Sequence, residues 1–385
     1  MDEEILEREE AQERPTEEQP PAEKPAIKTV WERLASTEKP IVLYGMGDGA
    51  DKILAVMAEK GIRPAEFMAS DEFVRGQSFH GYRVKKLAEI EAEYDDFFLV
   101  ICFGSAIPEV MERIARLAER YETVAPDVPV VGGGLFDGAY LTAHESEIKE
   151  VRALFADDRS REIFDALVYY RLTGEISALK SAETAKDEAL ALLKIGTREI
   201  YMDLGAYDGD TVEAFLRLTD KKFEKIYAVE PDRRNYSRMR RRLYSLGSGV
   251  FSHYNAAVTE EDGEVVLSRR ANRGTAVVAE NPPGDTPSQK RERTETVDGR
   301  SVDSILNGGR ATLIKYDVEG SEAAALRGSA ATIAKYKPRL IVSLYHRTED
   351  LVALPLLVRE LNPAYKLYLR HHPYIPAWDT NLYCI

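Results

Sequence analysis

Short apolar runs alternate with stretches of helical periodicity along most of the chain. Residues 40–44, 65–69 and 97–103 predict buried strands, and residues 50–60 and 108–121 carry apolar side chains at helical spacing. Strands that alternate with helices favour a parallel sheet covered on both faces. We therefore predict an α/β fold, with a doubly wound, Rossmann-like domain at residues 29–140.

A second set of strand-like runs begins near residue 196. Residues 141–195, between the two sets, have apolar positions at three- and four-residue spacing and no strand-like run. We expect a helical linker there, which packs on the second core or, alternatively, lines the substrate opening. The second domain spans residues 196–385, and its seven expected strands fit an open sheet with an antiparallel last strand. These strands are expected at residues 199–203, 225–230, 250–255, 312–317, 339–344, 365–370 and 380–385.

The first 28 residues differ in composition from the rest. They contain ten acidic and four basic residues, several prolines and almost no large apolar side chains. Such a segment cannot bury enough surface to offset the entropy lost on ordering. We predict a disordered acidic tail at residues 1–28, with an interaction arm as the alternative.

Charge and cysteine content limit the partners of the chain. A formal net charge of −14 disfavours nonspecific binding to nucleic acid or to an anionic membrane surface. Cys102 and Cys384 lie in apolar runs and form no zinc-type cluster, and no apolar run reaches the roughly 20 residues of a membrane helix. We expect a cytoplasmic protein that acts on a small molecule, with a homo-oligomer left open.

The most specific pattern is D-x-G-x-x-x-G, formed by Asp203, Gly205 and Gly209 after an apolar run and before a helix-like segment. A glycine-rich turn at the carboxyl end of a strand lets a ligand approach the backbone closely. The acids in this loop, including Asp208 and Asp210, would repel phosphates and favour a cationic ligand with an amino acid end. S-adenosylmethionine carries such groups, and we expect it as the cofactor.

Residues at the ends of the next two strands extend this predicted site. Glu230 lies where a carboxylate meets a ribose diol in doubly wound sheets. Asn255 and Ala256 follow the third strand and are suited to seat an adenine. The expected cofactor contacts are Asp203, Gly205, Tyr207, Gly209, Glu230, Asn255 and Ala256.

Three further residues are candidates for catalysis. Transfer of a methyl group to an alcohol needs a base near the departing proton. His346 is the first candidate because its unperturbed pKa lies near neutrality, and Asp317 and Glu319 are the runners-up. Alternatively, His346 bonds its neighbours at a strand end and Glu319 caps the following helix. Asp317, Glu319 and His346 also offer suitable ligands for a divalent cation, but we predict no metal site.

The first strand-to-helix turn of the N-terminal domain is close to a G-x-G-x-x-G fingerprint. Gly45, Gly47 and Gly49 occupy this turn. Asp71 follows the second strand, where its carboxylate is placed to accept a hydrogen bond from a ribose hydroxyl. We expect a nucleotide to bind there. In the alternative interpretation, the glycines only permit a tight turn and close helix packing.

Three segments together resemble the FkbM family of S-adenosylmethionine-dependent methyltransferases over about residues 196–385. They are M-D-L-G-A-Y-D-G at 202–209, V-E-P at 229–231 and K-Y-D-V-E-G-S-E at 315–322. The seven strands expected in the second domain fit the sheet of class I methyltransferases, with its antiparallel last strand. The resemblance implies an O-methyltransferase that acts on small molecules or sugars, with Asp203, Gly205 and Glu230 as cofactor contacts. More loosely, the first domain is similar to small Rossmann-like domains that precede sugar-modifying enzymes. This similarity implies that a nucleotide sugar binds at Gly45, Gly47, Gly49 and Asp71.

These observations predict methylation of a hydroxyl on a sugar, nucleotide sugar or related small metabolite, with the first domain holding the acceptor. One alternative is a noncatalytic module that binds a nucleotide or S-adenosylmethionine to regulate a partner. Another is a dehydratase or reductase that uses NAD in the first domain.

Overall fold

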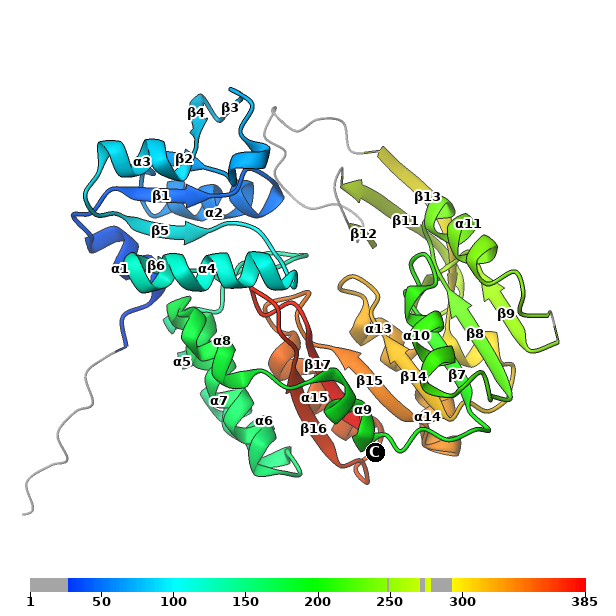
Figure 1. The fold of residues 1–385 in the computed structure, drawn as a ribbon. Coiled ribbons are helices and arrows are strands. Elements are labelled where there is room, and N and C mark those ends of the chain that lie inside the picture. Colours follow the sequence, from blue (N-terminus) through cyan, green and yellow to red (C-terminus); the bar gives the residue numbers. More distant parts are fainter. Residues whose placement is uncertain (1–26, 248, 271–273, 278–292) are drawn as a thin grey trace, which may run out of the picture.

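The computed structural model describes residues 27–247, 249–270, 274–277 and 293–385 (Figure 1). All but the last two residues of the predicted acidic tail at 1–28 lie outside these ranges. The described chain forms two large sheets with a group of helices between them, and a smaller sheet beside the second.

The first sheet has the strand order β3-β4-β2-β1-β5-β6. All neighbouring strands in it are parallel except β3 and β4, which form an antiparallel hairpin at one edge. Parallel strands are usually buried on both faces, and every residue of β1 and β5 is buried here. The strands are β1 (Ile41–Tyr44), β2 (Glu66–Met68), β3 (Ser78–Phe79), β4 (Tyr82–Lys85), β5 (Phe98–Ile101) and β6 (Glu122–Val124).

Helices cover both faces of this sheet, which confirms the predicted α/β arrangement. Alternate residues of β1 and β5 point to opposite faces, so Leu43 and Val100 lie in one apolar cluster and Val42 and Leu99 in another. The first cluster includes side chains of α1 and α2, and the second those of α3 and α4. The helices are α1 (Val30–Ser36), α2 (Asp48–Glu59), α3 (Leu87–Glu93) and α4 (Pro108–Arg120), with a 3-10 turn η1 at Asp71–Phe73.

Residues 141–195 are helical, as the spacing of their apolar residues predicts. The longest helix, α7, ends at Gly174 in the left-handed conformation and packs along β16 of the second sheet. None of the helices within the described ranges is long and apolar enough to cross a membrane. The segment contains α5 (Gly138–Ala143), α6 (Glu145–Leu154), α7 (Asp158–Thr173), α8 (Ile176–Ala182) and α9 (Lys186–Leu192).

The second sheet has the order β16-β17-β15-β14-β7-β8-β9. Strands β15, β14, β7, β8 and β9 are parallel, and β17 is inserted antiparallel between β15 and β16. This is the predicted seven-stranded class I methyltransferase sheet. Its strands are β7 (Ile200–Leu204), β8 (Lys225–Val229), β9 (Phe251–Tyr254), β14 (Leu313–Tyr316), β15 (Arg339–Ser343), β16 (Leu367–His371) and β17 (Thr380–Cys384).

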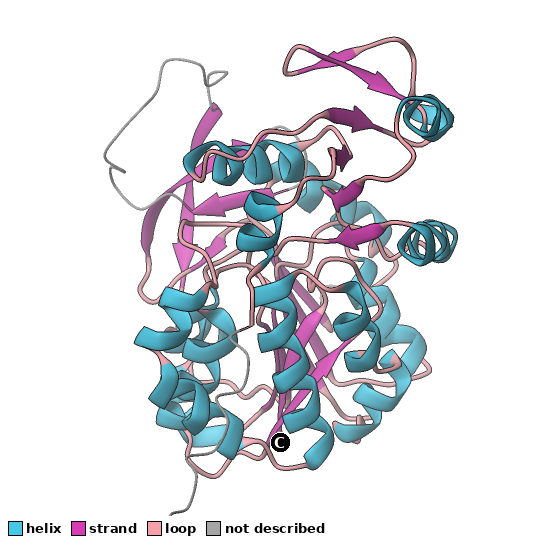
Figure 2. Cartoon of the chain, turned by 90° about the vertical axis from the view of Figure 1, so that its left-hand side faces the viewer, coloured by secondary structure: helices cyan, strands magenta, loops and turns pink. Residues whose placement is uncertain are grey.

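Two groups of helices enclose the second sheet, and Figure 2 shows helices on both of its sides. Side chains of α9, α10 and α11 pack with Tyr201 and Ile226 on one face. Those of α12 to α15 pack with Met202 and Ile314 on the other. The remaining helices are α10 (Asp210–Leu218), α11 (Arg233–Arg242), α12 (Val302–Leu306), α13 (Glu322–Arg327), α14 (Ala330–Tyr336) and α15 (Asp350–Leu361).

A smaller sheet with the order β10-β13-β11-β12 was not expected from the sequence. Residues 270–296 are mostly polar, and β12 and part of β13 fall within them. Only one face of this sheet is covered, by a small cluster around Leu267 and Val297, so its apolar pattern is weak. The strands are β10 (Ala257–Val258), β11 (Gly263–Arg270), β12 (Gly274–Val277) and β13 (Arg293–Arg300).

The two large sheets contact each other through residues that follow the carboxyl ends of their strands. Ser105, just after β5, exchanges two backbone hydrogen bonds of 2.8 and 3.0 Å with Ile375, after β16. The backbone N–H of Val131, after β6, donates to the carbonyl of His346, after β15, at 2.9 Å. The predicted cofactor loop and the glycine turn of the first domain therefore belong to sheet edges that face the same region.

We expect the Asp157→Ala variant to lower the free energy of unfolding by about 3 kcal/mol. Asp157 caps α7 because its carboxylate accepts a hydrogen bond from the backbone N–H of Ser160. The same carboxylate lies 2.6 Å from a guanidinium nitrogen of Arg370, whose side chain is buried. The substitution leaves that charge without its partner. Urea denaturation followed by circular dichroism measures the loss.

The matched control is Asp158→Ala, in the first turn of the same helix, which removes a surface ion pair with Arg161. We expect it to cost less than about 1 kcal/mol. Equal losses in the two variants would contradict the assigned role of Asp157.

Candidate active site

The glycine loop after β7 lies directly against the end of β14. Gly205 has a φ of +80°, and a β-carbon placed on it would lie 1.8 Å from the carbonyl oxygen of Asp317. No other residue type fits this position, because both the backbone conformation and the available space exclude a side chain. The loop therefore brings the predicted cofactor site and the predicted catalytic residues together.

The rest of the loop leads into α10. Gly209, with a φ of +90°, is the N-cap residue of that helix, and Tyr207 has a φ of +48° and a side chain that is 51% exposed. The backbone N–H of Tyr207 donates to Oε2 of Glu230 at 2.9 Å. The loop is thus tied to the end of the neighbouring strand β8.

Asp203 lies behind the loop and is fully buried. One carboxylate oxygen accepts from the hydroxyl of Thr211 at the start of α10. The other, Oδ1, has no hydrogen-bond partner among the described residues and lies 3.8 Å from Nζ of Lys315. Burial raises the pKa of this carboxyl group, although Lys315 acts to lower it.

Glu230 is the acid at the end of β8, as predicted. Its two oxygens accept the backbone N–H groups of Tyr207 and Asp232, both at 2.9 Å. A carboxylate has about four acceptor sites, so two remain for ribose hydroxyls. Burial raises the pKa of Glu230 to about 7, although both N–H groups act to lower it.

The predicted adenine contacts lie beside this acid. The side-chain amide of Asn255 donates to the carbonyls of Glu230 and Pro231, each at 2.9 Å, and so closes the turn after β8. Ala256 is buried beneath it. Only the amide oxygen of Asn255 is left to meet an adenine, and direct contact stays a prediction.

Asp317 occupies the end of β14 and is held by three donors. Lys315 lies 2.9 Å from one of its oxygens, and the hydroxyls of Ser343 and Tyr345 donate to the other at 3.1 and 2.9 Å. Burial acts to raise the pKa of Asp317, but the charges of Lys315 and His346 outweigh it and lower the pKa to about 2. Asp317 is therefore ionised throughout the physiological range.

His346 is buried among acids. Its Nδ1 atom lies 2.9 Å from Oε1 of Glu322, outside good hydrogen-bond alignment, and its Nε2 atom lies 3.7 Å from oxygens of both Asp317 and Glu319. Burial alone would lower the pKa of the imidazole. The carboxylates, Glu322 foremost, raise it instead to about 10, so His346 is a cation at neutral pH.

Glu319 is the most accessible of these acids, with a side chain that is 38% exposed. Its φ of +52° is rare for a residue with a side chain, and such strain is common at functional sites. The Glu319 side chain makes no hydrogen bond to the following helix, and Glu322 accepts the N–H of Val318 instead. Burial raises the pKa of Glu319, which His346 acts to lower.

Asp317, Glu322 and His346 also form a group with potential metal ligands. One ligand atom from each lies within 4.8 Å of the others. The predicted absence of a metal stays a prediction, and no catalytic step is assigned to an ion.

Residues 203–375 match the family model described as Methyltransferase FkbM domain. This part of the chain is an FkbM methyltransferase domain. It uses S-adenosylmethionine, and the site fits this cofactor because Glu230 keeps free acceptor positions and the buried Asp203 keeps an unpartnered oxygen.

A solved structure supports the fold over nearly the whole chain. The methyltransferase FkbM of Methylobacillus flagellatus KT is 22% identical, with a TM-score of 0.68, and the match covers 92% of this chain and 93% of that one. At this identity the match establishes the fold, including the N-terminal sheet, and not the substrate.

Other solved methyltransferases match only about half of this chain. An rRNA methylase from Streptococcus thermophilus is 13% identical over 51% of this chain and 93% of its own, with a TM-score of 0.33. Fibrillarin from Aeropyrum pernix, with natively bound S-adenosylmethionine, is 10% identical over 52% and 74%, with a TM-score of 0.32. No curated protein matches the chain.

Three residues beside the candidate catalytic residues were not predicted from the sequence: Lys315, Glu322 and Tyr345. Lys315 carried a signal, since it precedes Asp317 by two residues and so lies on the same face of β14. Glu322 and Tyr345 carried none, because their roles depend on contacts with His346 and Asp317 that only the fold creates.

The glycine turn of the N-terminal sheet packs closely on its neighbour. A β-carbon on Gly49 would lie 2.4 Å from the carbonyl oxygen of Cys102, so this glycine permits close helix packing, and Gly47 caps α2. Gly45 has a φ of +130°, and Asp71 begins the 3-10 turn after β2. Nucleotide-sugar binding at this turn stays a prediction.

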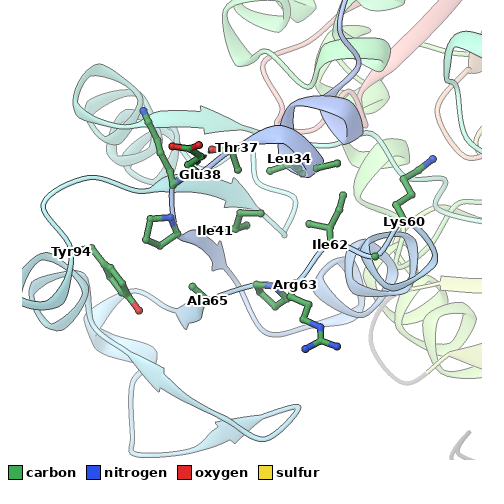
Figure 3. A pocket seen from close by; sticks show the side chains of 14 residues that line it. Leu34, Thr37, Glu38, Ile41, Lys60, Ile62, Arg63, Ala65 and Tyr94 are labelled. Carbon is green, nitrogen blue, oxygen red and sulfur yellow. Dashed lines mark hydrogen bonds between the residues drawn. The ribbon is translucent and has the colours of Figure 1, made fainter.

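A separate pocket of about 440 Å³ lies on the N-terminal domain (Figure 3). It is lined by Ile41, Ile62 and Tyr94, among others, at the amino ends of β1 and β2. The glycine turn and the FkbM site lie beyond the carboxyl ends of their strands. This pocket therefore has no part in the site described above.

We predict that the affinity for S-adenosylmethionine rises with pH in step with ionisation of Glu230. With a pKa of about 7, the ionised fraction increases roughly tenfold between pH 6 and pH 8. The ionised carboxylate accepts hydrogen bonds from ribose hydroxyls more strongly than the acid does. Calorimetric titration across this range should show a rise in affinity of up to roughly tenfold.

The Glu230→Gln variant tests whether Glu230 causes the pH dependence of the affinity for S-adenosylmethionine. We expect weaker binding at every pH, with no dependence between pH 6 and pH 8. A variant curve that runs parallel to the wild-type curve would assign the titration to another group.

Proposed function

We propose that this enzyme methylates a hydroxyl group of a sugar, nucleotide sugar or related small metabolite. The observation that carries the proposal is the position of Glu319. Its carboxylate is accessible at the rim of the site, next to the ionised Asp317 and the buried cation of His346. An accessible acid with a raised pKa suits a general base for an alcohol.

The bound cofactor supplies the methyl group: the acceptor oxygen bonds to the methyl carbon as the carbon–sulfur bond breaks, and the electron pair remains on sulfur in S-adenosylhomocysteine. Glu319 takes the hydroxyl proton as the new bond forms and passes it to solvent. Asp317 and Lys315 fix the neighbouring wall of the site, and three donors occupy most of the acceptor positions of Asp317.

The choice of Glu319 over the other two candidates follows from their protonation states. His346, the first candidate by residue type, is protonated at neutral pH and so has no lone pair to accept a proton. Asp317 is ionised, but its pKa of about 2 makes it a weak base. We assign His346 the role of holding Glu319 and Asp317 in place by its charge.

A small acceptor is favoured by the charge of the protein and by the setting of the site. The net charge of −14 disfavours nonspecific binding to a nucleic acid. Residues of the N-terminal half reach the rim beside His346. This arrangement suits an acceptor held between the two halves of the chain.

We predict that Glu319→Gln lowers the turnover number by roughly 10²- to 10⁴-fold, since general base catalysis contributes about that much. Affinity for S-adenosylmethionine should stay within about twofold of wild type, because Glu319 lies outside the ribose and adenine positions. Formation of S-adenosylhomocysteine with a panel of sugars and nucleotide sugars measures turnover, and calorimetry measures cofactor binding.

Glu349→Gln is the matched control, an exposed acid before α15 on the same segment as His346. It should behave as wild type. Full activity in Glu319→Gln would remove this residue from catalysis. Cofactor binding without S-adenosylhomocysteine formation for any acceptor would instead support a noncatalytic binding module.

A further inference from the structure

A loop of the N-terminal half forms part of the rim of the methyltransferase site. The N–H of Val131 donates to the carbonyl of His346 at 2.9 Å, and the hydroxyl of Thr348 donates to the carbonyl of Gly134 at 3.2 Å. From the other side, Nζ of Lys52 on α2 donates to the carbonyls of residues 129 and 130 at 3.1 and 2.7 Å. Residues 129–134 are therefore fixed between the two halves.

Arg347 lies between this loop and the backbone next to Glu319. Its Nε atom donates to the carbonyl of Gly320 at 2.6 Å. A β-carbon on Gly320 would lie 3.2 Å from that Nε, and one on Gly132 would lie 3.0 Å from Nη1. Gly320 and Gly132, with φ values of +92° and +85°, thus leave the space that the guanidinium occupies.

The hydrogen-bond donors at this position lack protein acceptors. Within the described ranges, neither Nη1 nor Nη2 of Arg347 has a hydrogen bond or an ion pair with an acid, and the N–H groups of residues 132–134 donate to no protein atom. Gly132, Gly133 and Gly134 are exposed. The nearby acids Asp317 and Glu319 are engaged with Lys315 and His346 instead.

We propose that Arg347 and the backbone of residues 132–134 bind an anionic group of the methyl acceptor, specifically a phosphate. This inference rests on the proposed O-methyltransferase function and names the substrate class: a phosphorylated or nucleotide-linked sugar. A planar guanidinium pairs with phosphate oxygens in a fixed geometry, and exposed backbone N–H groups in a glycine-rich turn add further donors.

The position of this anion site relative to Glu319 gives it a role in orientation. Arg347 contacts Gly320, which directly follows Glu319 in the chain. A phosphate held there anchors the acceptor at one end while a hydroxyl farther along the molecule reaches the base. Such an anchor converts binding energy into correct placement of the reacting group.

The test uses the full-length protein saturated with S-adenosylhomocysteine. Calorimetry measures binding of inorganic pyrophosphate, glucose 1-phosphate, uridine diphosphate glucose, glucuronate and glucose. Four variants are compared: Arg347→Gln, Arg347→Lys, Gly133→Leu and Gly247→Leu. A β-carbon on Gly133 would meet no other atom and its φ is not positive, so leucine fits the fold there and covers the loop. Gly247 has the same open space and backbone conformation but lies away from the site, so Gly247→Leu is the control.

We expect at least one phosphate compound to bind wild type, and Arg347→Gln to lose about tenfold or more in affinity, as loss of a charged hydrogen bond implies. Arg347→Lys should retain part of the affinity, Gly133→Leu should weaken it, and Gly247→Leu should match wild type. Neutral glucose should bind more weakly than glucose 1-phosphate. If glucuronate binds more strongly than every phosphate compound, the anion that this site recognises is a carboxylate and not a phosphate.

The anion proposal is overturned if no phosphate compound binds, or if Arg347→Gln and Gly133→Leu both bind phosphates as wild type does. Either outcome leaves the methyltransferase assignment intact provided that the protein still binds S-adenosylmethionine and forms S-adenosylhomocysteine with an uncharged acceptor. Phosphate binding without any S-adenosylhomocysteine formation would overturn the proposed function and not the anion site.

Discussion

The ammonium group of Lys315 joins the two halves of the methyltransferase site. It is largely buried on the central strand β14, 2.9 Å from Asp317 and 3.8 Å from Asp203 on the adjacent strand β7. Without this cation, the buried carboxylate of Asp203 and the partly exposed one of Asp317 would repel each other at the point where Gly205 packs on the Asp317 backbone. The contact between the cofactor loop and the reaction rim therefore depends on one buried charge.

The same alternation of charge continues outward from Lys315. Asp317 follows, then the cation of His346, then Glu319 and Glu322. Each inner charge has a partner of opposite sign within about 4 Å, which compensates the cost of burial. Glu319 is the most exposed of these charged groups, and His346 is its one ion-pair partner among the described residues. Its environment leaves it the acid best able to exchange a proton.

The sequence predicted most of the fold and the glycine turn after β7 for a physical reason. Strands that are buried on both faces read as continuous apolar runs, and only glycine fits the turn at Gly205, so both leave local signals. The protonation of His346 left no local signal in the sequence, because it depends on Glu322, which only the fold brings next to the imidazole. Residues 131–134 lie far from His346 in the chain, and the one-sided sheet around Leu267 has too few apolar positions to stand out.

The pair of backbone hydrogen bonds between Ser105 and Ile375 has a consequence for how molecules enter and leave. Opening of the two halves like a hinge would break both bonds and pull Gly104 away from the ring of Trp378, against which it packs. Backbone groups exposed in this way lose their partners without gaining new ones from protein. We therefore expect the two halves to stay joined at this contact during turnover, so that the acceptor and product enter and leave without a hinge motion about it.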